Sequence, residues 1–232
     1  MNTQALPFTR EAFLAMFAAY NEAVWPLHIV AYGLAILAVL LAIRPFLRGS
    51  DRLIAAVLAA FWLWIGGVFF MSYQRLIDQS PISTIATVAF LIQGVLFLWF
   101  GVVQRGLTFK PGLDVFGVTG GALLAYAGLI YPLFSYLGGH IFPASPGFGL
   151  GTVPCPTTIF TFGLLLWTST RVPKWVLVVP TLWALMGGIS APLNYGIYED
   201  LGLLVAGVLG TGLLLWRDRH VSRSASLQPR YA

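Results

Sequence analysis

The chain has 232 residues, of which 58% are hydrophobic and only 9% are charged, and its mean hydropathy is +0.83. A soluble domain of ordinary composition carries about 25% charged residues. A globule of this length cannot hide so much apolar surface in its own core, so lipid must cover the remainder. The length allows about seven spans of roughly 20 residues and excludes a separate soluble domain.

The net charge of +5 does not indicate a nucleic-acid partner, because the basic residues sit at predicted helix ends and not in one patch. The single cysteine, Cys155, excludes an internal disulfide framework. The N-terminus does not resemble a cleaved signal peptide. Arg10, Glu11 and Glu22 interrupt its apolar stretch, and a full-length span follows.

The first element expected is a short amphipathic helix over residues 9–24. Thr9 can cap its start, and Glu11 suits the positive end of the helix dipole. We expect this helix to lie in the membrane interface or over the mouth of the bundle, and the alternative is an extended start to the first span. Its apolar side chains recur at helical spacing, at Phe13, Met16, Phe17, Tyr20 and Val24.

Seven apolar segments follow, each bounded by charge or by Gly and Pro, and they predict an all-α, polytopic seven-helix transmembrane bundle. The fifth is the shortest and must begin near Pro154 or Pro156 to cross, which puts proline in its first turn, where it is tolerated. Pro26 has a similar place in the first span, and Pro180 is expected inside the sixth. The segments are Trp25–Phe46, Leu53–Tyr73, Ile82–Val103, Val115–Leu137, Thr157–Thr168, Trp175–Tyr195 and Leu201–Trp216.

The expected organisation is an N-terminal segment over residues 1–24, a membrane domain over 25–217 and a tail over 218–232. Lysine and arginine placement orients it in an inner or plasma membrane, with the N-terminus outside and the C-terminus in the cytoplasm. The outer side then holds only Arg10 and Arg75, and the alternation holds for every loop. The cytoplasmic side holds Arg44, Arg48, Arg52, Arg105, Lys110, Arg171, Lys174, Arg217, Arg219, Arg223 and Arg230.

Polar side chains gather at the predicted outer end. The longest outer loop, residues 138–158, carries a histidine and the cysteine among glycines and prolines. The start of the first span and the turn before the last span lie on the same side. The candidate ligand-binding residues are Tyr20, Asn21, Trp25, His28, Gln93, His140, Cys155, Thr157, Asn194, Glu199 and Asp200.

Three interpretations of these residues stay open. The first is a metal site at His140, Cys155 and Asp200, because imidazole, thiolate and carboxylate suit zinc or copper, although the spacing matches no metal signature. In the second, Gln93 and Asn194 orient a small organic ligand in an apolar cavity. Its walls would come from Trp25, Trp62, Trp64 and Trp99.

The third interpretation is structural. Thr157 and Thr158 would then satisfy free backbone groups at a helix start, and the loop residues would have no ligand.

Several chemistries are disfavoured by what the spans lack. No span carries a lysine or a carboxylate near its middle, and both Lys110 and Lys174 lie in loops. Because the last span has no lysine, no retinal is expected. His28 is the only candidate for proton coupling, and it lies less than a turn past Trp25 and Pro26. Without HExxH, GxSxG or P-loop motifs, hydrolase and ATPase functions lose support.

Three segments together carry a resemblance that covers nearly the whole chain. They read LPFTREAFLAMFAAYNEAVWP, GGHIFPASPGFGLGTVPCPTTIFTFGLLL and YEDLGLL, and the most specific piece is PCPTTIFTFGLLL. The chain resembles an uncharacterised family of small bacterial multi-pass membrane proteins. The resemblance implies a location in a bacterial membrane, and it implies no particular reaction. The second span departs from the sequence pattern of the family. The polar positions that it implies are Tyr20, Asn21, Trp25, His140, Cys155, Thr157 and Asp200.

The leading hypothesis is a membrane protein that binds a small molecule or ion, transporter-like or permease-like, with its site open to the outside. The alternatives are a membrane-embedded metal-dependent enzyme or metal-handling protein at His140, Cys155 and Asp200, and a sensor or assembly factor that acts through a partner protein. A function without catalysis is favoured. The expected partners are the lipid bilayer, a small-molecule or metal ligand, and a second copy of the chain.

Overall fold

The computed structural model describes residues 8–226, with side chains described through Arg219, and this part of the chain is all-helical. The expected basic residues Arg223 and Arg230 lie outside the described side chains. Six helices are long and apolar enough to cross a membrane, which indicates a multi-pass membrane protein. They cover Arg10–Ile43, Ser50–Ile77, Pro81–Val103, Val115–Leu137, Lys174–Tyr195 and Tyr198–Arg219.

Three of the six long helices change their winding along their length. In each, an α-helix passes into a π-helical turn (η1, η2 or η3), and two of the three then continue as α-helix. The bounds of all elements are α1 (Arg10–Ile43), α2 (Ser50–Trp64), η1 (Ile65–Gln74), α3 (Arg75–Ile77), α4 (Pro81–Phe97), η2 (Leu98–Val103), α5 (Val115–Ala125), η3 (Tyr126–Ile130), α6 (Tyr131–Leu137), α7 (Pro154–Leu166), α8 (Lys174–Tyr195), η4 (Tyr198–Asp200) and α9 (Leu201–Ser226).

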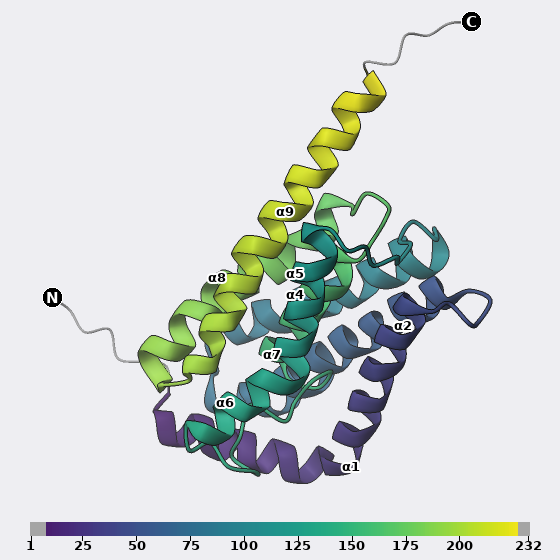
Figure 1. Ribbon diagram of the computed structural model, residues 1–232. Helices are drawn as coiled ribbons and strands as arrows, with labels where there is room; N and C mark the ends of the chain where they lie inside the picture. The colour runs from purple at the N-terminus through teal and green to yellow at the C-terminus, as the bar shows by residue number, and fades with distance from the viewer. Residues whose placement is uncertain (1–7, 227–232) are drawn as a thin grey trace, which may run out of the picture.

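Helix α1 is continuous from Arg10 to Ile43, so the expected N-terminal helix and the first span are parts of one helix. Thr9 caps its start as predicted, accepting a hydrogen bond from the backbone N–H of Ala12. Pro26 lies inside the helix and not in a first turn. Figure 1 shows α1 bent, with its N-terminal part lying across one end of the bundle. A proline inside a helix is a common cause of such a bend.

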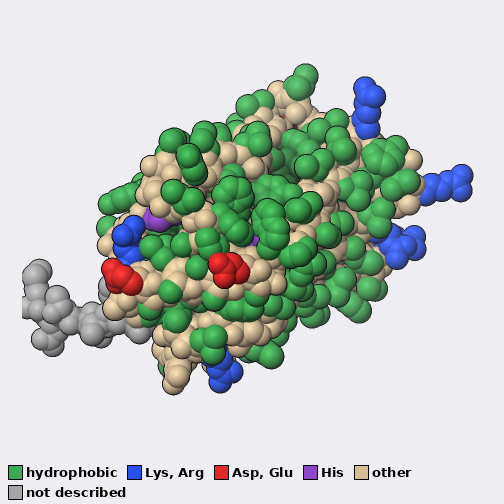
Figure 2. Space-filling model, turned by 90° about the horizontal axis from the view of Figure 1, so that it is seen from below, with side chains coloured by type: hydrophobic (Ala, Val, Ile, Leu, Met, Phe, Trp, Pro, Cys, Tyr) green, Lys and Arg blue, Asp and Glu red, His purple; other side chains and the backbone are tan. Residues whose placement is uncertain are grey.

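The face that this part of α1 turns to the bundle follows helical spacing. Its buried side chains include Met16, Phe17, Tyr20, Asn21 and Val24, which recur at intervals of one, three and four residues. Four of them were expected on the apolar face from the sequence. On the other side, Glu11 and Glu22 are exposed. Figure 2, which views the molecule from below, shows a surface that is largely hydrophobic with few charged side chains.

Helix α7 begins at Pro154, as predicted for the fifth segment, and ends at Leu166, before the expected Thr168. Its 13 residues extend about 20 Å, which is less than the roughly 30 Å of a hydrocarbon core. All of its residues except Cys155 are buried. It packs against α2, α5, α8 and α9. The fifth segment is therefore an internal helix that faces protein and not lipid.

Small residues set how closely the helices around α7 approach. In the seventh span, Gly202, Ala206 and Gly210 recur at four-residue spacing, which predicts a face for close helix contact. In the structure, Gly202 of α9 lies against Tyr126 and Gly210 lies against Phe162. In the fourth span, the closest approach occurs instead at Gly120, which faces Gly163 of α7. The same spacing in the fourth span predicts a face at Gly117, Gly121 and Ala125, and Gly120 lies next to that face.

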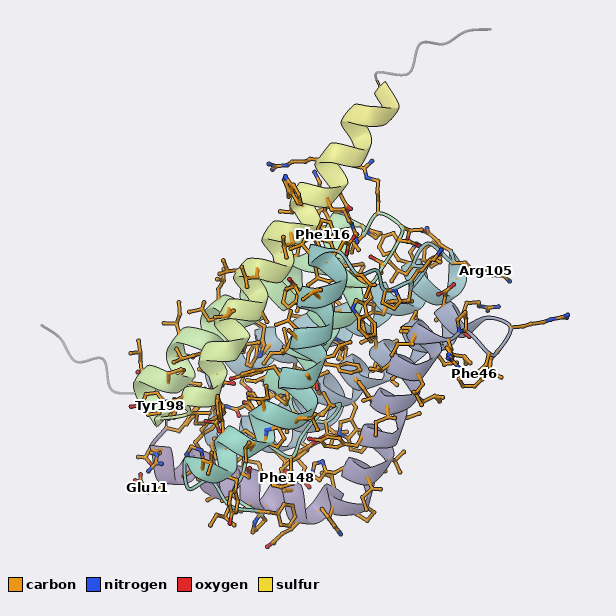
Figure 3. The ribbon with its side chains drawn as sticks, in the orientation of Figure 1. Glu11, Phe46, Arg105, Phe116, Phe148 and Tyr198 are labelled. Carbon is orange, nitrogen blue, oxygen red and sulfur yellow. The ribbon has the colours of Figure 1, made fainter. Side chains whose placement is uncertain are left out.

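Loops meet at the end of the bundle that lies away from the N-terminal part of α1 (Figure 3). In Figure 3, Glu11 and Tyr198 lie at one end, whereas Phe46 and Arg105 lie toward the other. At this second end, Arg217 of α9 donates hydrogen bonds to the backbone oxygens of Thr168 and Thr170. The loops before α5 and after α7 meet there, in an isolated antiparallel bridge between Phe109 and Thr168.

Candidate functional site

A histidine links an arginine to a carboxylate at the end of the bundle that α1 crosses. His140 Nδ1 lies 3.2 Å from Oε1 of Glu199, and its Nε2 lies 3.3 Å from Nη2 of Arg10. An arginine side chain has only donors, so Nε2 must accept, and Nδ1–H donates to the carboxylate. His140 and Glu199 are each 3% exposed. The link therefore joins α1, the loop after α6 and η4 through one buried imidazole.

The next residue in the chain, Asp200, takes part in a different set of contacts. Tyr131 Oη donates to Oδ1 of Asp200 at 2.6 Å, and both side chains are buried. The thiol of Cys155 lies within hydrogen-bonding reach of the same carboxylate. Adjacent carboxylates on η4 thus have different partners: Glu199 meets His140, whereas Asp200 meets Tyr131 of α6 and Cys155 of α7.

Three of the predicted residues hold the loop over residues 138–153 against α1. Tyr20 Oη donates to the carbonyl of Thr152 at 2.6 Å, and His28 Nδ1 lies 2.9 Å from Thr152 Oγ1. Asn21 Nδ2 donates to the carbonyls of Pro143 and Ser145 at 2.6 and 2.8 Å. These contacts satisfy backbone groups in an irregular segment that lies against protein.

Replacing Asn21 with alanine is expected to loosen this loop. Two backbone carbonyls lose their donor, and each hydrogen bond contributes about 1 kcal/mol. We expect faster cleavage within residues 138–153 by limited proteolysis of the detergent-solubilised protein. Asn194→Ala is the matched control, because Asn194 is exposed and makes no hydrogen bond to this loop. Equal cleavage of both variants would contradict the role given to Asn21.

A cavity of about 270 Å³ opens at this end of the bundle, between α1, the end of η1, α4 and α8. Pro154 and Cys155, the first residues of α7, also line it. Much of the wall is aromatic, with Phe13 and Phe17 from α1 and Trp183 from α8. The polar residues in the lining are Gln74, Asp78, Ser83, Cys155, Ser190, Asn194 and Asp200.

The sequence placed three of these lining residues among its candidates, namely Cys155, Asn194 and Asp200. It missed Gln74, at the end of η1, and Asp78 and Ser83, on either side of the turn into α4. Asp78 follows an apolar span and is an ordinary loop acid by sequence. Its burial, at 6% exposed, is the only signal of a further role, and that signal is tertiary.

The remaining candidates lie elsewhere. Gln93 donates to the carbonyl of Val176 in the contact between α4 and α8. Thr157 accepts from the backbone N–H of Gly151 and donates to the carbonyl of Val153, which is the structural role considered for it. Trp25 is 48% exposed and contacts Phe142 edge to face.

The tryptophans suggested as cavity walls also lie elsewhere. Trp62 is fully buried in the core and donates to Thr161, while Trp64 donates to Tyr20. Trp99 is 52% exposed. The cavity takes its indole from Trp183 instead.

The three residues considered for a metal divide between the two sets of contacts. His140 pairs with Glu199, whereas Cys155 and Asp200 face the cavity. Within residues 8–219, no three His, Cys, Asp or Glu side chains come close enough together to hold a metal ion.

The fold and the cavity define a multi-pass helical membrane protein with a partly polar cavity at one end of its bundle. The chain belongs to DUF6064, a family of unknown function, and the match covers residues 10–225. The resemblance to a family without an established activity is thereby confirmed over nearly the whole chain. No curated protein and no solved structure matches the chain.

Proposed function

We propose that this chain is a seven-helix membrane protein that binds a small organic molecule in the cavity beside Asp200 and carries it as a transporter-like or permease-like protein. The observation that carries the proposal is the cavity itself. It combines apolar and aromatic walls with a few polar groups, which is the usual composition of a small-molecule site. Its volume suits a ligand at the small end of that class.

A carrier function is supported by the short helix inside the bundle. Transport sites are often formed where a discontinuous helix ends at a cavity, with irregular backbone beside it. The N-terminus of α7 lines the cavity, and the loop before it packs into the protein, with Ser145, Leu150 and Val153 buried. Irregular backbone at membrane depth is tolerated where it lies against protein or a cavity.

The topology in this proposal counts α7 as the fifth traverse, completed by the irregular segments at its two ends. The N-terminal part of α1 then lies in the outer interface, and the basic loops near Arg105 and Arg217 face the cytoplasm. The cavity opens at the outer end. The separation of Glu11 and Arg105 to opposite ends of the bundle supports this orientation.

A cavity-filling substitution tests the function. Ala86 of α4 lines the cavity, and Ala86→Trp would occupy it. The purified protein is screened against a library of small molecules by thermal shift, and the ligands found are tested for uptake in proteoliposomes. We expect ligands to stabilise the wild type and to have no effect on Ala86→Trp.

The control is Ala19→Trp, because Ala19 is exposed on α1 and lies outside the cavity. It should bind as the wild type does. If Ala86→Trp fails to fold, Ala191→Phe, from the α8 side of the cavity, replaces it. Ligands that stabilise the filled variant as strongly as the wild type, or a library with no ligand at all, would overturn the proposal.

A further inference from the structure

Two buried carboxylates line the cavity without a cation beside them. Asp78 is 6% exposed and accepts a hydrogen bond from the backbone N–H of Ser80. Asp200 is 2% exposed and accepts from Tyr131. Among the side chains described, residues 8–219, neither has a Lys, Arg or His within 4.0 Å. A buried carboxylate is costly unless positive charge or donors compensate it.

Unpartnered polar atoms in the same lining point to a ligand. Gln74 is 7% exposed, and its Oε1 has no hydrogen-bond partner. Ser83 is 2% exposed, and its Oγ has none either. Buried polar atoms are almost always paired, and an amide oxygen can only accept. The lining therefore presents two unpaired oxygens that a donor from the cavity can satisfy, beside one unpaired indole N–H, Nε1 of Trp183.

The charges around the cavity all have one sign. No Lys, Arg or His is among its lining residues. Of the two arginines at this end, Arg10 is engaged with the carbonyl of Tyr195 and with His140. The other, Arg75, is exposed and does not line the cavity. A carboxylate ligand would face repulsion from Asp78 and Asp200, and it would find no cationic side chain in the lining.

The aromatic walls favour an organic cation over a bare metal ion. A ligand cation over an aromatic face is attracted by the ring quadrupole, most strongly in a desolvated site. The rings that line the cavity come from three helices and include Phe13, Phe70 and Trp183. A metal ion would need several oxygen ligands at short range, whereas this cavity offers dispersed acceptors and apolar surface.

We infer that the cavity binds a small organic ammonium ion, whose N–H groups meet Asp78 and the free oxygen of Gln74, one helical turn away, while its apolar body packs on the aromatic wall and Asp200 adds negative charge to the same lining. This inference rests on the proposed function and specifies the ligand class of the same cavity.

Three probes with the same aromatic body test the inference by isothermal titration at neutral pH in constant salt. They are phenethylammonium, phenethyl alcohol and phenylacetate. We expect the ammonium ion to bind the wild type at least about 10-fold more tightly than the alcohol, and phenylacetate not to bind. Loss of a buried charge partner costs about 2 kcal/mol or more, so Asp78→Asn should weaken ammonium binding by at least about 30-fold.

Glu22→Gln is the matched control, because Glu22 is an exposed acid of α1 outside the cavity, and it should leave all three affinities unchanged. If Asp78→Asn does not fold, Gln74→Leu is the second variant, because it keeps all carboxylates. It should also weaken binding of the ammonium ion more than binding of the alcohol. Binding of the alcohol or the carboxylate as tightly as the ammonium ion would overturn the inference and leave the small-molecule function in place. Binding of none of the three would overturn the inference, while the library screen with Ala86→Trp decides the function separately.

Discussion

Replacing Gly163 with leucine is expected to prevent the chain from folding into a monodisperse bundle. Gly163 lies on α7 where this helix meets α5. A Cβ added there would lie 2.7 Å from Cγ of Leu124 and 3.0 Å from the carbonyl oxygen of Gly120. The backbone oxygen cannot move aside without shifting α5. Overpacking a core costs about 1–3 kcal/mol, and a clash with backbone on an enclosed helix lies at or above the upper end.

Fluorescence-detected gel filtration of the detergent extract measures this effect. We expect the monodisperse peak to be lost for Gly163→Leu, and a lowered melting temperature for the milder Gly120→Ala. Gly33→Leu is the control, because Gly33 lies on α1 and a Cβ there meets no atom within 4 Å. It should behave as the wild type or slightly better, since leucine is the better helix former. A normal peak for Gly163→Leu would show that α5 and α7 do not approach so closely.

Removing the imidazole of His140 is expected to destabilise the protein strongly. His140→Leu leaves the buried carboxylate of Glu199 without its donor and separates it from Arg10. His140 is neutral in this arrangement, and loss of a hydrogen bond to a charged group typically costs about 1.5–3 kcal/mol, here because the buried carboxylate stays behind without its donor. The free energy of unfolding, followed by tryptophan fluorescence in denaturing detergent, should fall by about that amount.

A double-mutant cycle measures the interaction energy between His140 and Glu199 apart from the effect of each single substitution. His140→Leu combined with Glu199→Leu removes both partners, so the double variant should be less destabilised than the sum of the single variants by at least about 1 kcal/mol. His28→Leu is the comparison, because His28 is also 3% exposed but is hydrogen-bonded only to the neutral Thr152. It should cost about 1–2 kcal/mol. Additive effects at His140 and Glu199 would show that the two side chains do not interact.

Much of the helical architecture could be predicted from sequence because lipid requires each span to satisfy its backbone internally. Apolar runs between charged loops therefore marked the long helices, and the proline pair at Pro154 and Pro156 marked where α7 begins. Whether α7 faces lipid or protein could not be predicted in the same way. An apolar run of this length looks alike whether it faces lipid or is enclosed by neighbouring helices.

The cavity was less accessible to sequence analysis. Its wall brings together residues far apart in the chain, from Phe13 to Asp200, and no spacing relates them. Cys155 and Asp200 stood out as unusual residues near predicted span ends. Gln74 and Ser83 did not, because polar residues at the end of a span normally meet water. Only packing shows that these two are enclosed.

The sequence also did not predict how the helix of the fourth span is rotated about its own axis. The small residues Gly117, Gly121 and Ala125 form a plausible contact face, yet the tight contact falls at Gly120. Which face of a glycine-rich helix meets a neighbour is decided by that neighbour, here by Gly163 and Trp167 of the α7 segment.

One continuous helix, α1, both lines the cavity and contributes an apolar span. Phe13 and Phe17 belong to its N-terminal part, whereas the segment after Pro26 carries exposed apolar side chains such as Ile36 and Leu40. A span adapts to the thickness of the surrounding bilayer by tilting. Because the two parts share one backbone, we expect tilt of the span to shift the rings at the cavity. The shape of the cavity should then depend on the thickness of the bilayer around the protein.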